Sequence, residues 1–105
     1  MDDTKPTING IGLPSCSRGD LLSAFFQWVR TTIESDGPVS VRSISNAVVI
    51  GGELRRRAVE KSDISLLRDA HTVMNEIRET IATLKSGNRI DAGTTIHLPH
   101  GGVIV

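Results

Sequence analysis

The stretch SDISLLRDAHTVMNEIRETIATL, residues 62–84, decides the fold of this 105-residue chain. Apolar side chains recur in it at alternating steps of three and four residues, which is the spacing of one face of a helix. The residues of this stripe are Leu67, Ala70, Met74, Ile77, Ile81 and Leu84. A long helix with one apolar face must bury that face, so the stretch predicts a helix that packs against other helices.

The width of the stripe indicates what kind of packing to expect. When Leu67 is taken as position a of a heptad, the g positions are also mostly apolar: Leu66, Val73 and Thr80. A stripe three positions wide suits a helix with two neighbours better than a two-stranded coiled coil. One neighbour is expected to come from a second copy of the chain. The residues predicted to mediate self-association are Leu66, Leu67, Val73, Met74, Ile77, Ile81 and Leu84.

Further helices are predicted upstream. A helical stripe runs from about residue 20 to 36, with Ser17 or Asp20 as its cap and Gly37-Pro38 after its end. A second helix begins near Ser40. Gly51-Gly52 predicts a break or a kink in it, because each glycine costs about 1 kcal/mol relative to alanine in a helix, and helix resumes over 53–61. A short buried strand over 46–50 stays open as an alternative, because so short a run has no decisive period.

The two ends of the chain differ from this helical middle. Residues 1–16 are rich in Pro and Gly and predict a flexible N-terminal arm. Residues 88–105 are rich in β-branched residues and turn formers, and Thr94–Leu98 with Val103–Val105 predicts a β-hairpin. The expected organisation is therefore an arm over 1–16, a helical domain over 17–87 and a hairpin or tail over 88–105. The fold class is mainly α, a bundle of three to four helices with a short C-terminal β-hairpin, in a dimeric protein.

Composition and charge narrow the classes of function. Twelve basic and twelve acidic side chains cancel, so no overall field draws the chain to nucleic acid or to a membrane. The middle, residues 42–68, carries six bases against three acids and is mildly basic. The acidic N-terminus predicts no signal peptide, no stretch approaches the ~20 apolar residues of a membrane span, and the single cysteine forms no intrachain disulfide. We expect a soluble cytoplasmic protein.

No motif points to catalysis. No acidic residue interrupts an apolar stripe, and the glycine pairs at 51–52 and 101–102 fit neither a phosphate-binding loop nor a dinucleotide turn. The only conceivable metal ligands lack the paired spacing of a zinc site; they are Cys16, His71, His97 and His100. The sequence thus predicts no enzyme, no cofactor and no metal.

The run Arg55-Arg56-Arg57 has two interpretations. Together with Arg42 it could contact the phosphates of a nucleic acid. Glu53 and Glu60, however, lie at helical spacing for pairing along the same helix, and no aromatic residue is interleaved to stack on bases. A solvated helical face is favoured. A helix-turn-helix over 40–61 matches only in part, because it would need an apolar residue where Arg57 stands.

These features predict a small non-catalytic protein that homodimerises and binds another protein. With only three aromatic residues, the chain has little core to absorb its wide apolar stripe and its apolar C-terminal strand. An antiactivator, a chaperone-like escort or an assembly factor would have these properties. The expected partner contacts are Arg55, Arg56, Arg57, Val103, Ile104 and Val105. Two alternatives stay open: a nucleic-acid-binding regulator that uses residues 42–57, and a structural subunit of a larger assembly.

Overall fold

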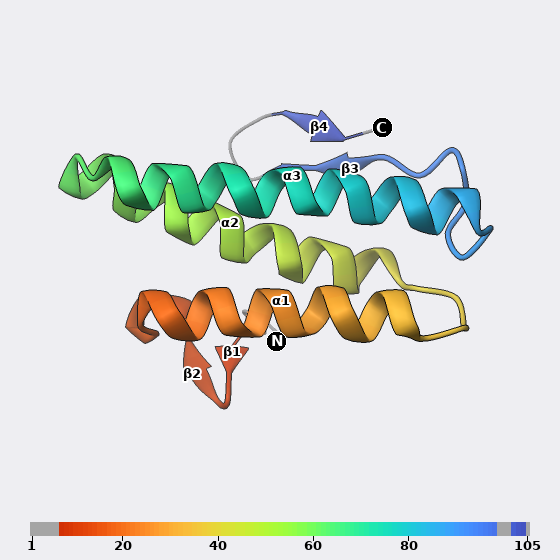
Figure 1. Cartoon of the computed structure of the whole chain (residues 1–105), viewed down its shortest axis with the longest axis horizontal. Coiled ribbons are helices and arrows are strands. Elements are labelled where there is room, and N and C mark those ends of the chain that lie inside the picture. Colours follow the sequence, from red (N-terminus) through yellow and green to blue (C-terminus); the bar gives the residue numbers. More distant parts are fainter. Residues whose placement is uncertain (1–6, 99–101, 105) are drawn as a thin grey trace, which may run out of the picture.

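The fold is mainly helical in a computed structural model of the chain, which describes residues 7–98 and 102–104. Three helices lie within this part, α1 (Arg18–Glu34), α2 (Val41–Lys61) and α3 (Ile64–Ser86). Two short antiparallel strand pairs flank them: β1 (Thr7–Ile8) with β2 (Ile11–Gly12), and β3 (Ile96–His97) with β4 (Val103–Ile104). Figure 1 shows α2 and α3 as an antiparallel pair with α1 alongside. The predicted mainly helical fold and C-terminal strand pair are confirmed.

Each helix begins at a polar cap that the sequence marks. The hydroxyl of Ser17 accepts a hydrogen bond from the Asp20 amide at 3.0 Å, and that of Ser40 caps α2 in the same way. The carboxylate of Asp63 accepts from the first free amides of α3, at 2.9 and 3.2 Å. These bonds satisfy amides that have no partner inside a helix. They fix where α1, α2 and α3 start.

The helix α2 is continuous through Gly51-Gly52, so the predicted break is wrong, and so is the alternative strand over 46–50. Gly51 is buried where α2 meets α3. A Cβ atom there would lie 3.0 Å from Met74 Sδ and 3.2 Å from Val73 Cγ1. The absence of a side chain lets the two helices approach closely, and this packing offsets the low helix propensity of glycine. Without a turn at this point, a helix-turn-helix over 40–61 is not formed.

The core lies between the three helices. Most of the α3 stripe is buried in it, but the buried face is rotated toward the g positions, so that Leu66 is buried and Leu67 is 37% exposed. From α1 the core receives Leu21 and Phe25. The buried apolar residues of α2 and α3 are Ile44, Ala47, Val48, Ile50, Leu54, Ala58, Leu66, Ala70, Val73, Ile77, Ile81 and Leu84. The wide apolar stripe of α3 is therefore covered largely by other helices of the same chain.

The C-terminal strand pair packs on the helices. Ile96 pairs with Ile104 and His97 with Val103, and both isoleucines are buried. Lys85 Nζ donates to the Thr94 carbonyl at 2.9 Å, which ties the preceding loop to α3. The strands are shorter than predicted, and residues 99–101 and 105 lie outside the described part. Figure 1 shows this pair on the side of the molecule away from α1.

Residues 7–16, which belong to the predicted N-terminal arm, form a short strand pair and a 3-10 turn. Asn9 and Gly10 both have positive φ, 52° and 80°, which suits the two-residue turn between β1 and β2. A 3-10 turn over Leu13–Ser15 follows. Leu13 and Cys16 are buried in the core, so this segment is anchored by its own side chains. Residues 1–6, also part of the predicted arm, lie outside the described residues.

Candidate interaction site

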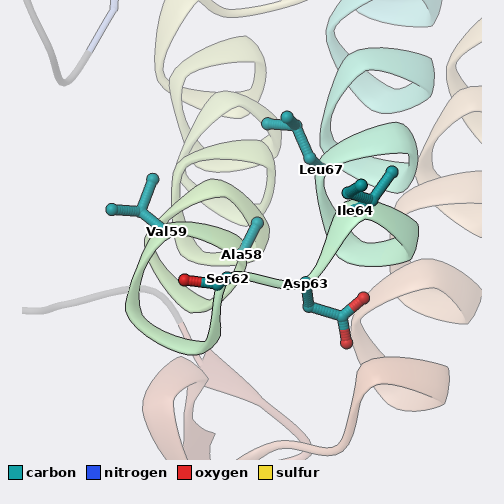
Figure 2. Close-up of a pocket in the computed structure, with 6 residues that line it drawn as sticks. All are labelled: Ala58, Val59, Ser62, Asp63, Ile64 and Leu67. Carbon is teal, nitrogen blue, oxygen red and sulfur yellow. The ribbon is translucent and has the colours of Figure 1, made fainter.

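An apolar cleft of about 320 Å³ opens at the turn between α2 and α3. It is lined by Ala58, Val59, Ser62, Asp63, Ile64 and Leu67. Figure 2 shows Ala58 and Val59 on the last turn of α2 and Ile64 and Leu67 at the start of α3, on either side of the connection. Val59 is 68% exposed and Ile64 74% exposed. We call this site the turn cleft.

The tight connection between the helices creates the turn cleft. Ser62 adopts a left-handed conformation, φ 50° and ψ 45°, which ends α2. The Asp63 amide donates back to the Ala58 carbonyl at 2.9 Å, and the Asp63 carboxylate then caps α3. With only two residues between the helices, the last turn of α2 lies directly beside the first turn of α3. Apolar residues on these two turns are thus brought together at the surface.

Burial increases along the stripe of α3 that begins at the turn cleft and runs toward the C-terminal end of the helix. Leu67, Met74 and Ile81 are seven residues apart and lie on one stripe of the helix. Leu67 is 37% exposed, Met74 is half-buried and Ile81 is 2% exposed. Beyond Ile81, Lys85 already holds the C-terminal segment. Toward its C-terminal end this stripe is therefore covered by the chain itself, and at the turn it is open.

The helical surface next to the turn cleft is basic. Arg55 precedes Val59 by four residues and Arg68 follows Ile64 by four, so each is a surface neighbour of an exposed apolar residue. Both arginines are exposed, and neither forms an ion pair within residues 7–98 and 102–104. The acid at the cleft is Asp63, whose Oδ1 atom is engaged in capping α3.

Arg57 is buried, which corrects its predicted place on a solvated face. Its Nε donates to Glu53 Oε2 at 2.8 Å, and its Nη2 donates to the carbonyls of Leu13 at 2.9 Å and Cys16 at 2.6 Å. Arg57 is 9% exposed and Glu53 7%. Arg57 thus holds the N-terminal segment against α2, and within this structure it is not presented to a partner.

Arg56 stays at the surface and is paired on both sides. It donates to Glu53 at 2.8 Å and to Glu60 at 3.0 Å. The hydrogen bond from Arg56 holds the pKa of Glu53 below its ordinary value; burial opposes this, and the hydrogen bond from Arg57 supports it. The pKa of Arg56 is raised by the same bond. Of the three consecutive arginines, Arg55 is the one with no ion pair in the described part of the chain.

Most residues predicted for self-association contribute to the core of the single chain. Those that are buried are Leu66, Val73, Ile77, Ile81 and Leu84. Leu67 and Met74 keep exposed surface, and Leu67 lines the turn cleft. At the C-terminus, Ile104 is buried and Val103 is half exposed, while Val105 lies outside the described residues. Self-association through α3 stays a prediction, for which the protomer surface offers only part of the expected residues.

The exposed residues Val59 and Ile64 were not predicted as site residues. Both lie outside the apolar stripes that define the cores of α2 and α3. The available signal was their position: an isolated aliphatic residue on a polar face, within three residues of the connection between two helices. Val59 and Ile64 form a cluster only because the short connection brings the two helices together.

A second exposed apolar surface lies on α1. Leu22, Phe26, Val29 and Ile33 follow one another at helical spacing. Phe26 and Ile33 are each 42% exposed, whereas Leu22 and Val29 are partly buried against the core. We call them the α1 outer stripe. The adjacent face of α1 carries Leu21 and Phe25 into the core. Within the chain, Leu22 and Val29 are partly covered by the core, and the exposed part of the arc is formed chiefly by Phe26 and Ile33.

No three metal-ligating side chains gather within residues 7–98 and 102–104, and none of the helices described there has an apolar stretch long enough to cross a membrane. Comparison of the chain with protein-family models, with curated proteins and with solved structures finds no match.

Proposed function

We propose that this chain is a small non-catalytic adaptor or regulatory protein that binds another protein through the turn cleft. Antiactivators, chaperone-like escorts and assembly factors all act by binding another protein, and the proposal covers these three types. The observation that supports the proposal is the clustering of Val59, Ile64 and Leu67 around one concave site at the surface. Scattered exposed apolar residues are ordinary, but a cluster around a cleft is typical of an interaction site.

The energy of covering these side chains is large enough to support binding. Full burial of one valine or isoleucine side chain contributes about 1.5–3 kcal/mol. Val59 and Ile64 together therefore offer several times the thermal energy to a partner that excludes water from them. Because their exposed area is not needed for the core of the chain, selection for folding alone would accept polar residues at both positions.

Self-association as a homodimer is the second part of the proposal, and the α1 outer stripe supports it. Two antiparallel copies of α1, related by a two-fold axis between residues 27 and 28, would place Leu22 of one copy opposite Ile33 of the other. The same axis places Phe26 opposite Val29. A two-fold interface must be complementary to itself in this way, and the spacing of the stripe meets that condition.

The surroundings of the arginine run favour a protein partner over a nucleic acid. Arg57 is buried and bonded to backbone carbonyls, and Arg56 is shared between two glutamates. Phosphate contacts by either residue would require those bonds to break. Arg42 and Arg55 are left as exposed cations in the 42–57 segment, which is a small electrostatic contribution for nucleic-acid binding.

The proposal is tested by site-specific photocrosslinking in cells that express the protein. A photoreactive phenylalanine analogue at Ile64 should give a discrete adduct of higher mass with one partner. The matched control carries the same analogue at Val41, which is exposed at the opposite end of α2, and should give no such adduct. Equal adducts from both positions, or none from position 64, would contradict binding through the turn cleft.

A further inference from the structure

The turn cleft combines an apolar centre with a rim whose charge is not neutralised. Val59 and Ile64 are exposed on the two sides of the cleft, on α2 and α3 (Figure 2). Arg55 and Arg68 lie one helical turn from them and form no ion pair with the part of the chain that the structure describes. The rim of this site therefore attracts anionic groups.

The nearby acidic side chains offset this charge only in part, because Glu53, Glu60 and Asp69 are paired with other arginines and Asp63 supplies one negative charge against two cations. Glu53 and Glu60 are bonded to Arg56, and Asp69 is bonded to Arg18 of α1. Asp63 accepts the amide hydrogens of Ser65 and Leu66 through one oxygen. Each of these carboxylates already has a hydrogen-bond donor within the chain. Within the described residues, Arg55 and Arg68 have no carboxylate partner.

We propose that the turn cleft binds a segment of a partner protein in which large apolar side chains are flanked by carboxylates. The apolar side chains cover Val59, Ile64 and Leu67, and the carboxylates meet Arg55 and Arg68. This inference rests on the proposed function and further specifies that the bound segment of the partner is acidic. Complementary charges around an apolar contact select the partner and speed its association, whereas like charges exclude it.

The inference is tested with three fluorescein-labelled helical peptides that share leucines at positions i, i+3, i+4 and i+7. Their flanking positions are all Glu, all Gln or all Lys. Binding to the full chain is followed by fluorescence anisotropy at low salt. We expect affinity to fall in the order Glu, Gln, Lys, with about a tenfold or larger difference between the first and the last. The difference should shrink at 0.5 M NaCl, because salt screens exposed charges.

Two variants separate the apolar contact from the charge. Ile64→Ser should weaken binding of all three peptides at least about fivefold, since it removes a large exposed apolar contact. The double variant R55Q/R68Q should bring the Glu peptide to the affinity of the Gln peptide and leave the Gln peptide unchanged. V41S, at the far end of α2, is the matched control and should bind like the wild type. All four positions are exposed, and circular dichroism verifies that each variant is folded.

The outcomes distinguish this inference from the proposed function. Equal binding of the three peptides that is still lost in I64S overturns the charge selection while the protein-binding cleft stands. Failure of all three peptides to bind overturns the inference, and crosslinking at position 64 then decides the proposed function separately. A labelled 20-base-pair duplex is included as a competitor. Tighter binding of the duplex than of the Glu peptide, lost in R55Q/R68Q, would overturn the inference in favour of a nucleic acid.

Discussion

Arg57 and Glu53 lie one helical turn apart on α2 and form a buried ion pair, with 2.8 Å between Arg57 Nε and Glu53 Oε2. The same guanidinium bonds the carbonyls of Leu13 and Cys16. A buried guanidinium is stable only when its donors are satisfied, and here the N-terminal segment supplies the acceptors. This pair therefore links the segment 13–16 to the C-terminal half of α2.

The first prediction concerns the loss of this link. Arg57→Met should lower the free energy of unfolding by about 3 kcal/mol, because Glu53 loses a buried partner and backbone carbonyls lose their donor. Urea unfolding followed by circular dichroism measures the change. Arg55→Met is the control and should stay within about 0.5 kcal/mol of the wild type, because Arg55 is exposed. Similar small effects of both substitutions would contradict the buried role of Arg57.

The second prediction concerns acid. The pKa of Glu53 is lowered in the folded protein by its hydrogen bond from Arg56, so its contribution to stability is present above the ordinary pKa of 4.5 and is lost as the pH falls through the folded value. The wild type should therefore lose more unfolding free energy than Glu53→Gln between pH 6 and pH 3. Parallel urea titrations measure this. Identical pH dependence of the two proteins would show that Glu53 contributes nothing to acid sensitivity.

The starts of the three helices were predictable because N-cap signals are local in the sequence. Ser17, Ser40 and Asp63 each offer a side-chain oxygen to amides two or three residues ahead, and the structure uses all three. The role of Arg57 was not predictable in this way. Its carbonyl partners lie 44 and 41 residues away in the sequence. The helical pattern of α2 alone assigns Arg57 to a solvated face, because it does not include the N-terminal segment that buries this side chain.

Gly51 shows the same limit for packing. A glycine inside a helix has a local cost, which predicts a break, whereas the benefit comes from α3, more than twenty residues later. The turn cleft depends on both kinds of information. Its position follows from the local end of α2, but its exposed residues become a cluster only through the contact between two helices.

The third prediction tests the close approach at Gly51. Gly51→Leu should destabilise the protein by about 1–3 kcal/mol, because its side chain would displace Met74 and Val73 from a packed contact. Gly37→Ala is the matched glycine control, since a Cβ atom there meets nothing within 4 Å, and it should be nearly neutral. Urea unfolding compares the two. An increase in stability from Gly51→Leu, as expected from helix propensity alone, would contradict the tight contact.

The fourth prediction separates core residues of α3 from surface residues. Ile77→Ala should cost about 2–5 kcal/mol, because Ile77 is fully buried. Ile64→Ala, on the same helix but exposed, should change the free energy of unfolding by about 0.5 kcal/mol or less. Thermal and urea unfolding give both values. Should Ile64→Ala prove as costly as Ile77→Ala, the turn cleft would belong to the folding core and not to an interaction surface.

The last prediction concerns the α1 outer stripe. Light scattering after size exclusion should give a mass near twice the 11.3 kDa of the chain, and Ile33→Arg should reduce it to that of one chain. The substitution places an unpaired cation opposite Leu22 of the other copy, while arginine suits the last turn of α1 and should preserve the fold. Ile64→Ser is the control and should keep the larger mass. If the wild type has the mass of a single chain at every concentration, the predicted two-fold pairing of α1 is wrong. A mass that keeps growing with concentration would indicate a larger assembly in place of a dimer.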